Sequence, residues 1–460
     1  MKRKQLSRRM FLAGTAAVIA GCKTRGPGII TTKSPNERLN VAGIGVGGQG
    51  HGDLSNVVRD TENLVALCDV DWDRASNSFN RWPDATKYKD FRVMLDKEAK
   101  NIDAVVVATP DHMHAFAAMA AMELGKHVYV EKPLTHSISE ARVLLKAARR
   151  YRVATQMGNQ GHSGEGVRQM CEMIWAGFIG EVKEAHIWTD RSKSHISSGW
   201  IQGQPNPLPE EPIPDTLDWN QWIGPAPMRP YNHGYCPFAW RGWWDFGCGA
   251  LGDMGCHIMD PAFWALDLSE PASVECIHQK DKNDQTGPSE AIVKYEFPAR
   301  HNRFAKKKMG PVDVYWYEGG LKPKRPEGVS EDEKLGDDSN GSLFFGENGV
   351  LTAGCYGGDS RLVPAAQMEA RKGELENVPK VLPRVRGSHH QSWVNACKTG
   401  EPSASNFEYA VPLTEMVLLG NLAMRSGEKV YWDAKNMCAT NNVPNVEQYV
   451  KREYREGWTL

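Results

Sequence analysis

The chain has 460 residues, 41% of them hydrophobic, and this length is enough for two or three ordinary domains. Its 55 basic and 56 acidic residues give a formal net charge of −1, whereas a nucleic-acid binder usually carries a basic excess or stripe. No run of about 18 or more apolar residues occurs. We therefore expect neither a nucleic-acid partner nor a membrane-spanning helix.

The first 22 residues are typical of a targeting segment rather than of a folded domain. Arg8 and Arg9 precede a short apolar run and resemble the twin-arginine signal, which is read by an export machinery. The run ends in Ile19-Ala20-Gly21-Cys22, which resembles a bacterial lipobox and makes Cys22 a candidate lipid anchor. The alternative is an ordinary basic start with a fortuitous cysteine. We expect an exported, periplasmic protein in which residues 23–37 form a flexible linker.

The ten cysteines are scattered, and none forms a C-x-x-C pair. A protein that folds before export does so in a reducing compartment, where disulfides are rare. We therefore expect mostly buried free thiols and no metal site.

Residues 38–158 alternate between strand-like and helix-like segments, which predicts a doubly wound parallel sheet of the Rossmann type. The strand-like runs are Arg38–Ile44, Leu64–Cys68, Ile102–Ala108, His127–Val130 and Val153–Met157. The clearest helix-like segments are Met113–Leu124 and Ser137–Arg150.

The pattern changes over residues 159–435, where a proline-rich loop at 205–214 separates a first helix and strand from later elements. Helices are expected at 164–176, 253–266, 388–398 and 411–426, and strands at 182–188, 291–297, 312–317 and 342–353. The alternating polarity of the later strands indicates an antiparallel sheet with one face covered. The segment 436–460 shows no clear pattern and is interpreted as a tail. The fold class is therefore α/β, with an N-terminal Rossmann domain and a C-terminal α+β domain.

A glycine-rich turn, Gly45-Val46-Gly47-Gly48-Gln49-Gly50, follows the first strand and opens a helix. Such a turn brings backbone close to a pyrophosphate, and the helix N-terminus attracts the phosphates. Asp69, 19 residues after Gly50 at the end of the next strand, is suited to accept hydrogen bonds from ribose hydroxyls and to repel a 2′-phosphate. This favours NAD over NADP, although a glycine-rich surface turn is the plain alternative.

Two further motifs supply groups for oxidising an alcohol. Glu131-Lys132-Pro133 ends a predicted strand, and Asp253 and His257 lie four residues apart on one face of a predicted helix. A histidine titrates near neutral pH and suits a general base, while a lysine can stabilise developing alkoxide charge. Each motif alone is more often a solvated turn or a surface pair; their combination with the glycine turn indicates an active site.

This combination resembles the glucose–fructose oxidoreductase / inositol dehydrogenase (Gfo/Idh/MocA) family, from about Arg38 to Asp433. The resemblance implies a C-terminal domain with a large, mainly antiparallel open sheet, through which family members often form homo-oligomers. It implies that Lys132 orients the reacting hydroxyl, that Asp253 binds substrate and that His257 is the base.

The segment Thr109-Pro110-Asp111-His112-Met113-His114 resembles the family's loop under the nicotinamide ribose, with Asp111 where asparagine is usual. The resemblance thus adds cofactor-binding residues to the glycine turn and Asp69. The full expected cofactor set is Gly45, Gly47, Gly48, Gln49, Gly50, Asp69, Thr109, Pro110, Asp111, His114, Glu131 and Lys132.

Tryptophan is concentrated just before and within the predicted catalytic helix. Flat aromatic faces stack on sugar rings, but tryptophan also packs in ordinary cores because it buries a large area. We expect two or three of the eight at a substrate rim and the rest in structural positions. The eight are Trp188, Trp200, Trp219, Trp222, Trp240, Trp243, Trp244 and Trp264.

The candidate substrate-binding residues come from this region and from the loop after the last Rossmann strand. They are Gln160, His162, Trp240, Arg241, Trp243, Asp253 and His257. His389 and His390 open a late helix, and a structural role is favoured for both.

Three functions compete. The first is an exported NAD(P)-dependent oxidoreductase that acts on a CH–OH group of a sugar, glycoside or polyol. The second is a redox-neutral glycosidase with tightly bound NAD, which oxidises, eliminates, adds water and reduces. The third is a sugar-binding lipoprotein with a relic nucleotide fold. Some NAD-dependent glycosidases that resemble the family lack the lysine of the Glu-Lys-Pro motif. The presence of Lys132 in this chain therefore favours the first function.

Overall fold

The computed structural model describes residues 28–31, 33–34, 36–193 and 199–460. The predicted export signal, Cys22 and the first part of the predicted linker lie outside the described residues. Within the described ranges, no helix is both long and apolar enough to cross a bilayer.

The N-terminal domain is built on a six-stranded, wholly parallel sheet of order β3-β2-β1-β4-β5-β6. This is the strand order of a doubly wound Rossmann sheet, so the fold-class prediction is confirmed. The strands are β1 (Asn40–Ile44), β2 (Asn63–Cys68), β3 (Thr86–Tyr88), β4 (Ala104–Val107), β5 (His127–Val130) and β6 (Thr155–Met157).

Helices cover both faces of this sheet, and therefore every residue of β4 and β5 is buried. The helices are α2 (Gln49–Val58), α3 (Ser76–Arg81), α4 (Phe91–Glu98), α5 (Asp111–Glu123) and α6 (Ile138–Tyr151). The start of α6 is fixed by a capping box, in which the side chains of Ser137 and Glu140 bond each other's backbone N–H.

The C-terminal domain contains a nine-stranded sheet of order β15-β14-β13-β7-β12-β9-β8-β16-β17. All neighbours are antiparallel except β7 and β12, which run parallel. The strands are β7 (Val182–Thr189), β8 (Ser273–Lys280), β9 (Glu290–Phe297), β12 (Val312–Glu318), β13 (Asn340–Gly346), β14 (Gly349–Ala353), β15 (Arg361–Val363), β16 (Val430–Asp433) and β17 (Cys438–Ala439). A separate hairpin pairs β10 (Arg300–Asn302) with β11 (Lys307–Met309).

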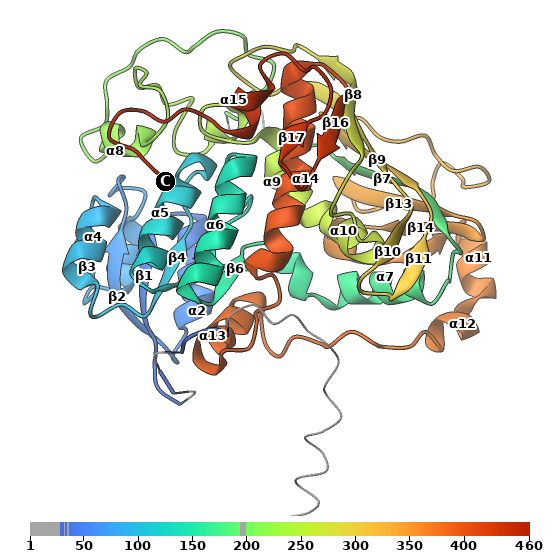
Figure 1. Ribbon diagram of the computed structural model, residues 1–460, viewed down its shortest axis with the longest axis horizontal. Helices are drawn as coiled ribbons and strands as arrows, with labels where there is room; N and C mark the ends of the chain where they lie inside the picture. Colours follow the sequence, from blue (N-terminus) through green and yellow to red (C-terminus); the bar gives the residue numbers. More distant parts are fainter. Residues whose placement is uncertain (1–27, 32, 35, 194–198) are drawn as a thin grey trace, which may run out of the picture.

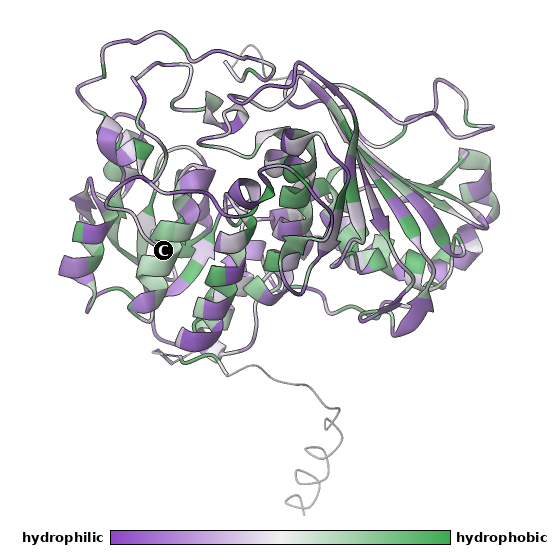
Figure 2. Ribbon diagram, turned by 45° about the horizontal axis from the view of Figure 1, so that its top comes forward, coloured by the Kyte–Doolittle hydropathy of each residue, from purple (hydrophilic) through white to green (hydrophobic). Residues whose placement is uncertain are grey.

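Only one face of the large sheet is fully covered, as the sequence predicts. Burial alternates strictly along β9, and polar and apolar residues alternate along the strands in Figure 2. The predicted strand at 342–353 is instead the hairpin of β13 and β14, because Glu347 and Asn348 form a turn between them.

The helices of the C-terminal half lie between the two sheets, at the outer edge of the large sheet and next to the Rossmann domain (Figure 1). They are α7 (Glu165–Trp175), α8 (Trp219–Ile223), α9 (Gly249–Ile258), α10 (Asp260–Leu266), α11 (Ala365–Ala370), α12 (Lys372–Glu376), α13 (His389–Thr399), α14 (Phe407–Ser426) and α15 (Val446–Val450), with short 3-10 turns η1 (Gln160–Ser163), η3 (Ala239–Gly242) and η4 (Cys355–Gly357). The long helix α14 stands between the two halves in Figure 1 and packs against α6, α9 and β8. An ion pair of 2.5 Å between Arg142 of α6 and Glu415 of α14 joins the halves at this contact.

Two expected elements differ from the structure. The helix predicted at 253–266 is two helices, because α9 ends at Ile258 and α10 starts again at Asp260 with Pro261 in its first turn. The segment 436–460 is not a loose tail: Trp458 packs on Phe116 with ring centroids 5.4 Å apart. The end of the chain therefore completes the packing of the first domain.

None of the described cysteines forms a disulfide, and most are buried. This agrees with the expectation of buried free thiols. Cys22 lies outside the described residues.

Candidate active site

A cavity of about 620 Å³ lies at the carboxyl ends of β1, β2, β4 and β5 and extends to α9. Ligands of doubly wound sheets bind at this edge, because the strand order reverses there. The cavity is lined at one end by Gly45, Gly47 and Gln49 and at the other by Asp253 and His257. We call these the turn end and the reaction end.

The glycine turn is compact enough that side chains are excluded from it. Gly45 has φ +75°, and a Cβ there would lie 2.8 Å from the Ala108 carbonyl group. A Cβ on Gly50 would lie 1.9 Å from the Gly45 oxygen. The turn leads directly into α2, whose N-cap residue Gly48 makes no side-chain cap bond. The N-terminus of a helix presents backbone N–H groups and a positive dipole end, and this suits a pyrophosphate.

Asp69 lines the turn end and also braces the turn from behind. Its Oδ2 accepts N–H bonds from Val46 and Gly47, at 2.8 and 3.1 Å, and its Oδ1 accepts one from Asp71 at 3.0 Å. Burial raises the pKa of Asp69 to about 6, against the lowering effect of these bonds. The ribose contact stays a prediction, and bracing the turn is a role that the motif does not reveal.

Arg74, which sequence reasoning missed, packs directly on the turn. Atoms of its side chain lie 2.6 Å and 2.4 Å from the positions that a Cβ on Gly47 and on Gly48 would take. Arg74 also lines the cavity. Its guanidinium adds a positive charge at the end where phosphates are expected.

The loop after β4 is only partly exposed to the cavity. Thr109 and Pro110 line it, and the buried Thr109 Oγ1 has no hydrogen-bond partner among the described residues. An orphaned hydroxyl facing the cavity fits a bound nucleotide, because a buried polar group normally has a partner. The turn, Asp69 and Thr109 together thus fit NAD.

Asp111 and His114 do not line the cavity, so their predicted cofactor contacts lack support. Asp111 Oδ2 accepts the N–H of Cys248 at 3.0 Å. The two ring nitrogens of His114 lie 2.8 Å from the carbonyl oxygens of Pro133 and Thr109. Asp111 instead holds the loop against the start of α9, and His114 holds it against the segment that follows β5.

At the reaction end, Lys132 and Asp253 meet although 121 residues separate them. Lys132 Nζ donates to Asp253 Oδ1 at 2.8 Å. Two arginines add to the pair: Arg241 Nε lies 3.3 Å from Oδ1 and Arg191 Nε lies 3.5 Å from Oδ2.

Neighbouring opposite charges keep both Asp253 and Lys132 ionised although the two side chains are largely buried. Burial opposes ionisation of Asp253, but Lys132 and then Arg241 outweigh it and hold the pKa of the carboxyl well below its usual range. Burial likewise opposes the charge on Lys132, but the Asp253 carboxylate raises its pKa on balance. Lys132 is therefore an ammonium group at neutral pH.

His257 lies one helical turn after Asp253 on the same face of α9 and lines the same cavity. Burial, followed by the charge of Lys132, lowers the pKa of its imidazole to about 3. Its Nδ1 is buried and has no hydrogen-bond partner among the described residues. The imidazole is therefore neutral at neutral pH, and one ring nitrogen of a neutral imidazole can accept a proton.

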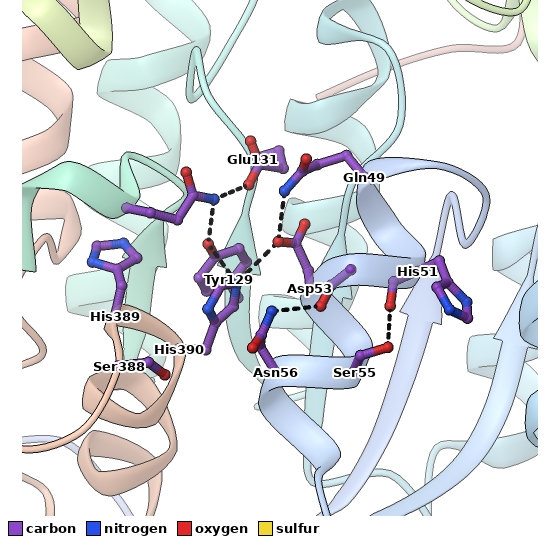
Figure 3. A network of polar contacts seen from close by, with 12 residues as sticks. Gln49, His51, Asp53, Ser55, Asn56, Tyr129, Glu131, Ser388, His389 and His390 are labelled. Carbon is purple, nitrogen blue, oxygen red and sulfur yellow. Dashed lines mark hydrogen bonds and ion pairs between the residues drawn. The ribbon is translucent and has the colours of Figure 1, made fainter. Parts of the chain in front are cut away.

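Glu131 belongs to a buried polar network that runs away from the cavity into α2 and α13 (Figure 3). Gln160 Nε2 donates to Glu131 Oε1 at 2.7 Å, and both side chains line the cavity. Asp53 accepts from Gln49 at 2.9 Å and lies 2.9 Å from His390 Nε2. Burial raises the pKa of both Glu131 and Asp53, and the negative charge of Asp53 raises the pKa of Glu131 further.

Both late histidines have structural partners, in agreement with the sequence-based preference. His390 stacks on Tyr129 with ring centroids 5.1 Å apart, and His389 Nε2 lies 2.8 Å from the Met157 carbonyl oxygen. These contacts fix α13 against the Rossmann domain.

Two predicted substrate residues lie elsewhere. His162 is buried, with Nδ1 3.1 Å from Asp260 Oδ2 and its ring stacked on Trp264 at 4.4 Å. Trp243 is 1% exposed, and its Nε1 donates to the Gly234 carbonyl at 3.1 Å. Neither side chain lines the cavity. Both predictions were wrong because the local spacing of an aromatic residue or a histidine does not reveal which face the fold buries.

Three of the eight clustered tryptophans line the cavity, namely Trp200, Trp222 and Trp240. One face of Trp240 is covered, because the Arg241 guanidinium stacks 4.2 Å from its ring centroid. Gln160, Trp240 and Arg241 thus all line the cavity. Their contact with substrate stays a prediction, and in the structure Trp240 holds Arg241.

Arg191 and Tyr356 are cavity residues that sequence reasoning missed. Arg191 follows β7, and Tyr356 lies in η4 with φ +60°, an unusual value for a tyrosine. The Tyr356 ring stands edge-on to His257 at 5.2 Å. The sole local signal is the glycine pair after Tyr356, which indicates a tight turn.

The fold and the site together define a two-domain oxidoreductase of the NAD-binding Rossmann class. The chain belongs to the Gfo/Idh/MocA oxidoreductase family. Residues 38–159 match the family's NAD-binding Rossmann domain, and residues 178–299 match its C-terminal α/β domain.

Curated relatives match over part of their length. The chain is 33% identical over 151 residues to inositol 2-dehydrogenase 3 of Saccharopolyspora erythraea, which covers 32% of this chain and 44% of that protein. It is 26% identical over 230 residues to an alpha-N-acetylgalactosaminidase of Shewanella oneidensis, covering 42% and 50%. The chain thus spans half or less of the length of these relatives.

Solved structures share the fold over almost their whole length. An inositol dehydrogenase homolog from Azotobacter vinelandii, complexed with NADH and myo-inositol, aligns with a TM-score of 0.54 at 17% identity, over 88% of this chain and all of that one. The WlbA dehydrogenase of Bordetella pertussis, in complex with NADH and UDP-GlcNAcA, aligns with a TM-score of 0.56 at 14% identity, over 86% and 99%. At these identities the likeness shows the fold alone.

Proposed function

We propose that the protein is an NAD-dependent oxidoreductase that oxidises a ring hydroxyl of a sugar, glycoside or polyol, with His257 as the general base. The observation that supports it is that Lys132, Asp253 and His257 line one cavity with the glycine turn. When bound, NAD supplies the acceptor for the hydride.

The side chains divide the remaining work. The Lys132 ammonium, held by Asp253 at 2.8 Å, orients the hydroxyl oxygen and stabilises charge that develops on it. His257, neutral because of its burial, takes the hydroxyl proton. Asp253 then stabilises the imidazolium as well as the ammonium, because it lies on the same helical face.

The test is a panel of sugars, glycosides and polyols incubated with the purified protein, with and without added NAD. Net formation of NADH, followed by absorbance, supports the oxidoreductase. A Lys132→Met variant should lose this signal and still bind NADH. If no member of a broad panel reduces NAD, the proposal is wrong.

A redox-neutral, NAD-dependent glycosidase is the second candidate, because the chain also resembles the Shewanella glycosidase over 230 residues. In that case the same base and hydride acceptor would serve a cycle that returns the hydride. Repeated aglycone release without added NAD and without net NADH identifies this activity.

We also propose that the protein is exported to the periplasm, that Cys22 carries a lipid anchor and that the large open sheet forms a homo-oligomer. The first two rest on Arg8, Arg9 and the motif that ends in Cys22. The third rests on the sheet face that the helices leave uncovered. Fractionation of cells that carry wild-type protein, the R8K/R9K variant or C22S, and the mass of the purified protein in solution, test the three.

A further inference from the structure

Among the described residues, the side chains at the reaction end of the cavity carry more positive than negative charge. Lys132, Arg191 and Arg241 come from three separate segments, and all three lie within 3.5 Å of the Asp253 carboxylate. Asp253 is the one carboxylate beside these cations among the described residues, and its single charge does not balance both Lys132 and Arg241. Because the four side chains are 11–24% exposed, solvent screens the surplus only in part.

The surplus is specific to this end. At the turn end, the lining cations Arg74 and Lys89 are matched by Asp69 and Asp71. The remaining acidic residue of the described lining is Glu131. Burial and then the negative charge of Asp53 raise its pKa, so Glu131 contributes little negative charge near neutral pH.

Arg241 is held in a fixed orientation before any ligand arrives. Its guanidinium stacks 4.5 Å from the Phe238 ring centroid and 4.2 Å from that of Trp240. Its Nη1 donates to the Phe238 carbonyl at 3.1 Å, and its Nε faces Asp253. A guanidinium has five N–H donors in a planar fork, which matches a carboxylate or a sulfate.

Stabilising an alkoxide does not account for this arrangement, because Lys132 alone supplies a cation for that purpose. Binding of oxidised nicotinamide adds a further positive charge at the reaction end. A neutral sugar would leave this charge without a counterion in a largely buried cavity, which is costly.

We propose that the substrate carries an anionic substituent, a carboxylate or a sulfate ester, and that Arg241 and Arg191 bind it beside the reacting hydroxyl. This inference rests on the proposed function, because it names the substrate class of the same site. A uronic acid unit and a sulfated sugar share the required chemistry, and the test separates them.

The first experiment measures binding rather than turnover. The NADH-loaded protein is titrated with hexuronates of different configuration, with the corresponding uronamides and neutral hexoses, and with sulfated hexoses, and NADH fluorescence is followed. We expect at least one anion to bind at least tenfold more tightly than its neutral counterpart, with an affinity that falls as salt rises. Equal binding of every anion and its neutral counterpart would overturn the inference.

Arg241→Gln and Arg191→Gln identify the residues responsible, and Arg149→Gln, an exposed residue of α6, is the matched control. We expect each cavity variant to weaken binding of the anion about tenfold or more, with little change for the neutral counterpart, and the control to change neither. Equal loss for both ligands would mean that the arginines only position Asp253, and would contradict the inference.

Turnover separates the inference from the function on which it rests. Net NADH from neutral sugars with no preference for the anionic member supports the proposed function and overturns the inference. Tight, arginine-dependent binding of an anion without NADH formation supports the inference on substrate class and contradicts the dehydrogenase.

Discussion

The two ends of the cavity are built in different ways. The glycines and charged side chains of the turn end lie within residues 45–89, and Thr109 follows the next strand of the same sheet. The reaction end combines residues that follow β5 and β7 with residues of η3, α9 and η4, so that Lys132 and Tyr356 line one cavity from distant parts of the chain. A nucleotide turn is therefore a local motif, whereas the chemistry at its far end depends on how two domains pack.

The largest effect should come from removing the base at the reaction end. His257→Asn keeps a similar shape but cannot accept the proton, so kcat should fall by roughly 10²- to 10⁴-fold. NADH affinity should stay within about twofold, because the turn end is unchanged. Steady-state kinetics and NADH fluorescence check both, and a kcat within a few fold of wild type would remove His257 from its role.

The pH profile of the wild-type protein sharpens the same prediction. Burial lowers the pKa of His257 to about 3, so the imidazole stays neutral and able to accept a proton well below the usual histidine value of about 6.5. We therefore expect kcat/KM of the wild-type protein to show no fall near pH 6.5 caused by protonation of His257. A fall near pH 6.5 that disappears in His257→Asn would contradict this expectation.

A comparable break at the turn end should remove cofactor rather than chemistry. A Cβ in Gly50→Ala would clash with the Gly45 oxygen at 1.9 Å, so the turn must open and NADH affinity should fall by roughly 100-fold, or about 2.7 kcal/mol. Gly52→Ala on the same helix is the control, because no atom lies within 4 Å of the new Cβ. If both variants bind NADH equally, the glycine turn does not hold the cofactor.

The smallest effect concerns the network that joins α2 to the cavity. The folded-state pKa of Asp53 is raised by burial, so its contribution to stability is complete below the unfolded value of about 4 and is lost as pH rises through the raised value. Asp53→Asn replaces the carboxyl by an amide that does not ionise, so the stability is no longer lost as pH rises. Relative to wild type, the variant should gain about 1 kcal/mol or more in the free energy of unfolding between pH 5 and pH 8.

Denaturant unfolding at several pH values measures this gain. Asp60→Asn, an exposed change just after the same helix, is the control and should leave the pH dependence as in wild type. A variant curve parallel to the wild-type curve would show that Asp53 does not titrate in this range.

Much of the fold could be read from local patterns. The buried valine runs of β4 and β5, the alternation in β9 and the glycine turn before α2 each report their own surroundings. The break between α9 and α10 and the turn between β13 and β14 were missed, because both interrupt a continuous apolar or alternating pattern for only one or two residues.

The site was predictable where a motif carries its own geometry. Lys132, Asp253 and His257 were found from their motifs and from a family resemblance, and they do converge on one cavity. His162 and Trp243 were misplaced, since nothing near them in sequence shows that Asp260 and Gly234 are their partners.

The sequence by itself determined the Rossmann domain, the nucleotide turn and the three side chains suited to alcohol oxidation, because these depend on short-range periodicity and on residue chemistry. The tertiary structure alone decided that Arg191 and Arg241 join Lys132 around Asp253, and that His257 is kept neutral. Ion pairing and desolvation act between atoms that are close in space, and their strength is set by packing that no local pattern encodes.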